Sequence, residues 1–157
     1  MSRSTPATHA LAKAGVAFRP LVYDYDPNAE RIGLAAAQAL GLEPEAVLKT
    51  LMTLVDGRPV CVIVPSDREI QMKALAALVG GKSAEMMKPA DAERMTGFKV
   101  GGISPFGQRK AAPAVLEEDA LLYDEVYING GQRGMLLGLS PEDARAFLDA
   151  TVGAVSA

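Results

Sequence analysis

The sequence predicts an α/β protein: a single domain, assigned to residues 1–157, with a mixed, strongly curved and barrel-like β-sheet flanked by helices. Residues 48–55 and 59–64 are largely apolar and are separated by Asp56-Gly57, a strong signal for a tight β-hairpin. Helix signals interrupt the other strand signals without the regular βαβ alternation of a doubly wound sheet. A chain of 157 residues is long enough to bury one hydrophobic core.

Helices are expected where a capping residue precedes an apolar run of helical spacing and a glycine follows it. The clearest helix begins at Thr5-Pro6 and ends at Gly15. Further helices are expected at 31–40, at 66–79 with Ser66 and Glu69 as a capping box, at 91–96 and from residue 140. Strands are expected at 18–25, 48–55, 59–64, 83–87, 98–100, 114–122, 125–128 and 135–139, and the last seven residues are expected to fray.

Composition and charge exclude several classes of function. The formal net charge of −3 disfavours generic nucleic-acid binding, and no helix-turn-helix signature indicates a DNA-binding regulator. No apolar run reaches membrane-spanning length and no signal-peptide pattern opens the sequence, so we expect a cytoplasmic protein with no membrane partner. Cys61 lies in an apolar strand and is expected to be buried and inert. His9 is the only histidine, which disfavours Ser-His, Cys-His and multi-histidine metal chemistry.

Lys49 is the first candidate functional residue. Alternation along the strand at 48–55 puts it on the same face as Leu51 and Val55. An ammonium group among apolar neighbours loses hydration unless an anion or a hydrogen-bond acceptor meets it. A solvated lysine at a frayed strand end is the alternative. We favour the binding role, because the following strand is expected to be central rather than exposed.

The loop at residues 98–110 is the second candidate. Gly101-Gly102 carries no side chains, so another molecule can approach the backbone closely, and Arg109-Lys110 would suit an anion lying there. A plain turn between two strands is the alternative interpretation.

The residue types limit the chemistry of such a site. Gly102 and Gly107 have the spacing of a P-loop, but Gln108-Arg109 stands where that motif requires Lys-Ser/Thr. The acidic residues form no metal-binding pattern, so neither a metal nor another cofactor is expected. A site could use Lys49, backbone amides near Gly101, and the hydroxyl groups of Tyr23, Thr50 and Ser104. Such groups suit a substrate that brings its own nucleophile, or a positioned water attacking an activated ester.

Three motifs, in order, resemble one known family. Leu48-Lys49-Thr50, the segment 101–108 and the segment 130–134 (Gly-Gly-Gln-Arg-Gly) are similar to the YbaK/EbsC family. These proteins are trans-editing aminoacyl-tRNA deacylases related to the inserted editing domain of bacterial prolyl-tRNA synthetase. The resemblance extends from about residue 3 to 150 and includes Tyr23-Asp24-x-Asp26-Pro27. Each motif alone is weak, whereas the combination in this order is specific.

The resemblance implies an enzyme that clears cysteine from tRNA(Pro), and in a broader form from tRNA(Cys). In the YbaK branch the thiol of the substrate attacks its own ester, so no nucleophile of the protein is required. Lys49 is implied to hold the 3′-terminal adenosine and its phosphate, and Gly101 to orient the aminoacyl group through its backbone. Further substrate contacts are expected from Tyr23, Ile32, Thr50, Gly102, Ile103, Ser104, Asn129 and Arg133. The acceptor end of tRNA is the expected partner, presented by prolyl-tRNA synthetase.

Two positions depart from the family pattern. Ile32 stands where cysteine-specific members tend to carry an aromatic residue, and Asn129 where they tend to carry serine. Activity on Ala, Ser or Thr esters of tRNA is therefore an alternative, with a water or hydroxyl replacing the thiol. A non-catalytic module that binds aminoacyl-tRNA or a synthetase is a second alternative.

Overall fold

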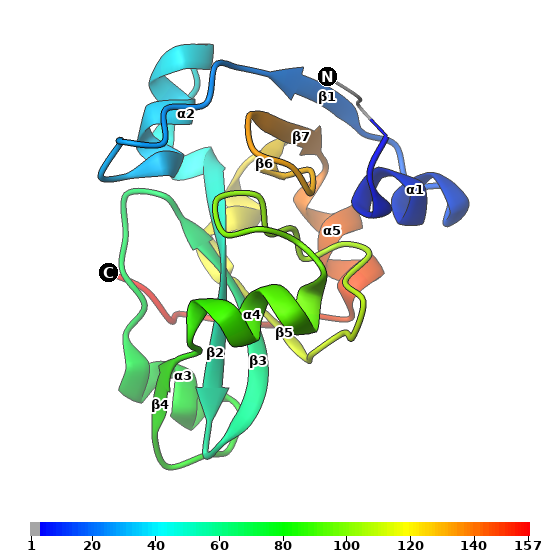
Figure 1. Cartoon of the computed structure of the whole chain (residues 1–157). Helices are drawn as coiled ribbons and strands as arrows, with labels where there is room; N and C mark the ends of the chain where they lie inside the picture. Colours follow the sequence, from blue (N-terminus) through cyan, green and yellow to red (C-terminus); the bar gives the residue numbers. More distant parts are fainter. Residues whose placement is uncertain (1–3) are drawn as a thin grey trace.

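The computed structural model describes residues 4–157, so the first three residues of the predicted domain lie outside the described part. One eight-stranded sheet runs through the described residues and is accompanied by five α-helices (Figure 1). The strands are β1 (Arg19–Val22), β2 (Val47–Val55), β3 (Arg58–Pro65), β4 (Ala84–Met86), β5 (Ala114–Glu117), β6 (Val126–Asn129), β7 (Met135–Leu139) and β8 (Thr151–Gly153). The α-helices are α1 (Pro6–Lys13), α2 (Ile32–Leu40), α3 (Met72–Leu78), α4 (Pro89–Thr96) and α5 (Pro141–Leu148), with short 3₁₀ turns at Pro44–Ala46 and Glu118–Leu122.

The sheet is mixed, as predicted. Its strand order is β1-β7-β6-β2-β3-β5-β8, and β4 pairs with β2 outside this path. The pairs β2–β6, β3–β5 and β5–β8 are parallel, and the other pairs are antiparallel. The order is an open path in which β1 and β8 are not neighbours, so the predicted barrel-like shape is not confirmed.

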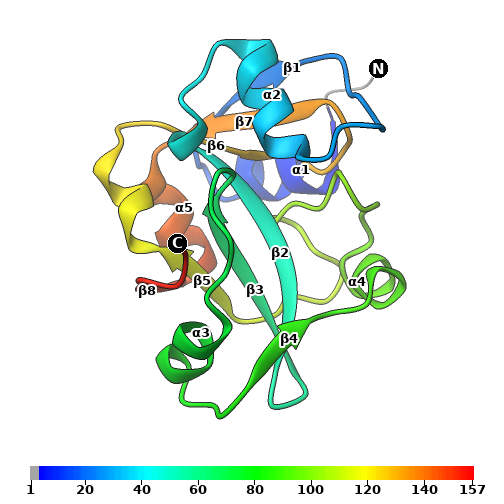
Figure 2. The ribbon, with the colours of Figure 1, turned by 90° about the vertical axis from the view of Figure 1, so that its left-hand side faces the viewer.

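The β2–β3 hairpin is confirmed and forms the long axis of the molecule in Figure 1. Its turn places both Asp56 and Gly57 at positive φ, +50° and +78°, as the Asp-Gly signal requires. β3 is buried from Val60 onward and is covered on both faces. Cys61 and Ile63 join the larger core cluster, whereas Val62 joins a second cluster packed under α3. Figure 2 shows α3 and α4 on opposite sides of this hairpin.

The predicted capping box at Ser66 and Glu69 is wrong, because α3 begins only at Met72 and its N-cap residue makes no side-chain cap. The Ser66 hydroxyl instead donates to the Pro44 carbonyl at 2.9 Å. The Glu69 carboxylate is directed to cations of other segments. The local cap, worth about 1 kcal/mol, is therefore not formed, and both side chains bond to residues of other segments.

Several strand boundaries also differ from the prediction. Residues 98–100 form a loop, the strand at 114–122 gives way to a 3₁₀ turn after Glu117, and the strand at 18–25 ends at Val22. The last residues do not fray: β8 pairs with β5, and Val155 is completely buried. The buried carboxylate of Glu117 anchors this segment by accepting hydrogen bonds from the Val155 and Ser156 amides, each at 3.0 Å.

No helix within residues 4–157 combines the length and the apolar character that crossing a membrane would require.

Candidate active site at the open edge of β2

One edge of β2 is left without a partner strand in its middle. β3 pairs along the whole of β2, but on the other edge β6 pairs only with Val47 and Leu48, and β4 only with residues 53–55. Backbone groups in an antiparallel ladder point alternately to the two edges. The Val47 carbonyl accepts from the Ser66 amide on the β3 side, so the amide and carbonyl of Thr50 face the open edge.

A cavity of about 440 Å³ wraps around this open edge. Residues from both faces of β2 line it, because no neighbouring strand separates the two faces there. The other walls come from the start of α2, the loop after β3, the segment joining β4 to α4, and the loop at 100–103. The lining includes seven of the predicted site residues: Tyr23, Ile32, Lys49, Thr50, Gly101, Ile103 and Asn129.

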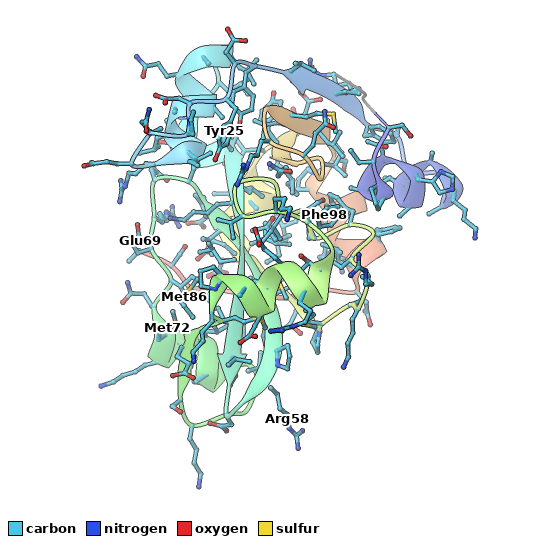
Figure 3. The ribbon with its side chains drawn as sticks, in the orientation of Figure 1. Tyr25, Arg58, Glu69, Met72, Met86 and Phe98 are labelled. Atoms are coloured by element: carbon cyan, nitrogen blue, oxygen red, sulfur yellow. The ribbon has the colours of Figure 1, made fainter. Side chains whose placement is uncertain are left out.

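Lys49 projects into the cavity from the face of β2 that also carries Leu51. Its side chain is 24% exposed, and its ammonium nitrogen lies 3.4 Å from Oε1 of Glu69. The sequence predicted that an anion or acceptor must meet this ammonium, and the Glu69 carboxylate is that anion. The same oxygen of Glu69 lies 3.0 Å from Nη2 of Arg31. In Figure 3, Glu69, Tyr25 and Met86 are labelled on three separate segments around this part of β2.

Thr50 lines the cavity from the opposite face of the strand. Its hydroxyl oxygen is buried and has no hydrogen-bond partner among the described residues. A buried polar group without a partner is costly and rare in native structures, so this hydroxyl is a candidate functional group. Thr50 therefore presents a backbone amide and carbonyl at the open edge, and its buried hydroxyl has no hydrogen-bond partner among the described residues.

Gly101 contributes bare backbone to the cavity. Its φ is +91°, and a Cβ added there would lie 2.6 Å from the Tyr25 hydroxyl oxygen, so only glycine fits. The amide of Asn129 donates to the Gly101 carbonyl at 3.2 Å, and the Asn129 side-chain oxygen accepts from the Gly131 amide at 2.7 Å. No described residue accepts a hydrogen bond from the Gly101 N–H.

Tyr23 and Ile32 complete the apolar end of the cavity. Tyr23 is 9% exposed, and burial, together with the neighbouring Tyr25, raises the pKa of its phenol. Tyr23 therefore stays a neutral hydroxyl group near neutral pH. Ile32 is the first residue of α2. The next residue, Gly33, lets α2 pack closely against Ser66, because a Cβ at Gly33 would lie 2.6 Å from the Ser66 Cβ.

Three of the predicted site residues lie outside the cavity lining. Ser104 is fully buried, and its carbonyl accepts from the Gln108 amide at 3.0 Å. A Cβ at Gly102 would lie 2.9 Å from the Arg133 backbone nitrogen, so Gly102 is where two loops touch. The Arg133 side chain donates to the Val100 carbonyl at 2.9 Å and stacks over Tyr25 at 5.5 Å. These residues support the loop around Gly101 from outside the cavity.

Lining residues that the sequence did not indicate include Arg31, Glu69, Met86 and Met87. Glu69 was assigned to a helix cap and Arg31 to a helix start, because both assignments fit local signals. The methionines lie in and just after the short strand β4, where nothing in the sequence indicates that they border a cavity. Their flexible thioethers form an adaptable apolar wall.

Cys61 and His9 take no part in this site. Cys61 is buried in β3, and burial raises the pKa of its thiol to about 12, so it is not a thiolate at neutral pH. His9 is exposed on α1. Within residues 4–157, no cluster of His, Cys, Asp and Glu side chains has an arrangement that could hold a metal ion.

The fold and the cavity define a class of protein. Residues 26–147 match the model of the aminoacyl-tRNA editing domain family, and the chain belongs to this family. That assignment agrees with the resemblance found in the sequence motifs.

Among particular relatives, EbsC of Enterococcus faecalis, described as a candidate Cys-tRNA(Pro)/Cys-tRNA(Cys) deacylase, is 38% identical over 109 residues, 69% of this chain. The multifunctional Ser/Thr-tRNA deacylase ProXp-y of Escherichia coli is 27% identical over 124 residues, 77% of this chain and 73% of its own length. The crystal structure of a candidate trans-editing enzyme for prolyl tRNA synthetase superimposes with a TM-score of 0.85 at 28% identity, covering 99% of both chains.

The match spans 66% of the length of EbsC. A second match, to a proline–tRNA ligase from Maridesulfovibrio salexigens, is 35% identical over 95 residues and spans 16% of the length of that ligase.

Proposed function

We propose that this protein is an aminoacyl-tRNA deacylase that removes cysteine mischarged onto tRNA(Pro). The observation that carries the proposal is the joint position of the Lys49 ammonium, the unpartnered Thr50 hydroxyl and the bare Gly101 backbone on one cavity. The family assignment supports the editing chemistry, and the likeness to EbsC supports the cysteine ester. A cytoplasmic location follows from the proposed substrate.

In the proposed reaction the substrate brings the nucleophile. The cysteine sulfur attacks the carbonyl carbon of its own ester, the bond from that carbon to the ribose oxygen breaks, and the thiol proton passes to this oxygen. The products are free tRNA and a cyclic thioester. Lys49 would hold the phosphate and adenosine end, while the Gly101 N–H would donate to the carbonyl oxygen as negative charge develops on it.

Asn129 and Ile32 depart from the pattern of cysteine-specific members, so a different aminoacyl ester is a second candidate substrate. Asn129 is already committed to the Gly101 carbonyl and to the Gly131 amide, so it positions the loop rather than marking one side chain. The likeness to ProXp-y favours a second candidate activity on Ser or Thr esters, with Ala esters as a further option. For these substrates a water or a hydroxyl would replace the thiol.

Prolyl-tRNA synthetase is the proposed presenting partner. A net charge of −3 would give the protein a low intrinsic affinity for tRNA. Correctly charged tRNA would then be spared, and mischarged tRNA would be deacylated when a synthetase presents it. Tight binding of tRNA by the purified protein at physiological salt, with a steep salt dependence, would contradict this part of the proposal.

The direct test is deacylation of tRNA(Pro) charged with Cys, Ala, Ser, Thr or Pro. We expect rapid loss of the cysteine ester and little loss of the proline ester. Faster loss of the Ser or Thr ester would favour the second candidate. Binding of the charged acceptor end without turnover of any ester would identify a non-catalytic module and overturn the proposal.

A further inference from the structure

Two cations at the mouth of the cavity share a single carboxylate oxygen. Oε1 of Glu69 lies 3.0 Å from Nη2 of Arg31 and 3.4 Å from Nζ of Lys49. Arg31 precedes α2 and Lys49 lies on β2, so the two cations come from separate segments. All three residues line the cavity. The Glu69 oxygen thus occupies the position between a guanidinium and an ammonium group that an anionic oxygen of a ligand would take.

The backbone of Glu69 is fixed in place. Its amide donates to the Ala157 carbonyl and its carbonyl accepts from the Ala157 amide, each at 3.0 Å. The Gln71 amide donates to the Val155 carbonyl at 2.7 Å, and the buried Glu117 carboxylate holds the same segment. Glu69 is therefore held over the cavity by a strand-like bridge, although its side chain is 64% exposed.

We propose that Arg31 extends the phosphate contact already proposed for Lys49, and that Glu69 is a built-in competitor that occupies this site in the free protein. The inference rests on the proposed function for the identity of the phosphate-bearing ligand. Arg31 and Glu69 are more than half exposed and Lys49 is 24% exposed, so solvent and salt reach these ion pairs and an incoming phosphate can displace the carboxylate. Glu69 then weakens binding without touching the ester that reacts.

A purely structural role for Glu69 predicts the opposite result. If its carboxylate held Lys49 in a productive position, removal of the charge would misplace the ammonium and weaken binding. Competition predicts that removal of the charge strengthens binding of a phosphate-bearing ligand alone. The two roles are thus distinguished by the sign of one change.

Binding of adenosine 5′-monophosphate and of adenosine, each titrated by NMR, isolates the phosphate contribution without any turnover. We expect Glu69→Gln to tighten binding of the monophosphate about three- to fivefold, the size expected for exposed ion pairs, and to leave adenosine unchanged. Arg31→Gln should weaken binding of the monophosphate by a similar factor. The Arg145–Glu142 pair on α5 lies outside the cavity lining and supplies matched controls, Glu142→Gln and Arg145→Gln, with the same charge changes.

Equal tightening by Glu142→Gln would reduce the effect to net charge and overturn the proposal. Unchanged or weaker binding of the monophosphate by Glu69→Gln would overturn it as well. On charged tRNA, Glu69→Gln should lower KM about threefold with kcat within twofold, a split that shrinks as salt rises. Failure of the wild type to deacylate any ester would reject the proposed function, while the nucleotide titrations would still decide the phosphate site.

Discussion

The two neighbouring central strands, β2 and β3, differ in how their second edges are paired. β3 has β2 on one edge and β5 on the other, and six of its eight residues are buried. β2 has a full partner on one edge only, and the gap between β6 and β4 opens onto the cavity. β3 is paired on both edges at Cys61, whereas β2 has no strand partner on one edge at Lys49 and Thr50.

This difference explains why the cavity lies at β2 and not at β3. An interrupted edge exposes backbone donors and acceptors, and it lets side chains from both faces of one strand reach the same guest. Lys49 and Thr50 are adjacent in sequence and lie on opposite faces, yet both line the cavity. A continuous strand partner would separate these two faces and satisfy the Thr50 backbone. Substitutions in the two strands should therefore have different consequences, and those below are ordered by their expected effect on turnover.

Lys49→Ala should have the largest effect. Loss of the ammonium removes the proposed partner of the phosphate and adenosine end, and we expect deacylation of Cys-tRNA(Pro) to fall by about 100-fold or more. Single-turnover deacylation measures this, and thermal unfolding should show a Tm close to that of the wild type. Lys73→Ala, on the exposed side of α3, is the control and should keep full activity. Unchanged turnover by Lys49→Ala would remove this residue from the mechanism.

Gly101→Ala should lower turnover by about 10- to 100-fold, because the added Cβ meets the Tyr25 hydroxyl at 2.6 Å and moves the backbone donor. Gly57→Ala is a matched control: its φ is also positive, +78°, but no atom lies within 4 Å of the added Cβ. This control should lose about 1 kcal/mol of stability and no activity. Combining Gly101→Ala with Tyr25→Phe removes the clashing oxygen and should recover part of the activity; equal losses in both glycine variants would show that strain alone is responsible.

Ile63→Ala tests the paired strand. Ile63 is completely buried in β3, and its truncation should lower the free energy of unfolding by about 2–5 kcal/mol. Turnover per folded molecule should stay within about twofold, because the side chain does not line the cavity. Urea unfolding combined with deacylation below the transition measures both quantities. A large loss of turnover in fully folded protein would mean that the two strands are not functionally separate.

Cys61→Ala should have the smallest effect on turnover. Burial raises the pKa of the Cys61 thiol from about 9 to about 12, so in this range the native thiol keeps a proton that the unfolded chain releases. Its contribution to stability is therefore complete below pH 9 and is lost as the pH rises toward 12, by up to about 1.4 kcal/mol per pH unit. Comparison of alkaline unfolding between the wild type and Cys61→Ala isolates this contribution. Turnover of Cys61→Ala at neutral pH should match the wild type, and inhibition by thiol reagents of the native protein would contradict an inert cysteine.

The sequence by itself determined the local elements. The Asp-Gly turn, the Thr5 cap of α1 and the glycines that end α2 and α4 are signals that act within a few residues, and all are found in the structure. Alternation along β2 also identified Lys49 as an ammonium that needs a counter-charge. The pair Gly101-Gly102 also identified a stretch of backbone without side chains.

Tertiary structure alone decided how these elements combine. The gap in β2 exists because β6 and β4, separated from each other by about 40 residues of chain, share one edge without meeting. Glu69 left its expected cap for two distant cations, and the final segment became a strand because β5 and Glu117 offered it hydrogen bonds. Strand pairing and ion pairing depend on residues far apart in sequence, and such partners become apparent only when the sheet is assembled.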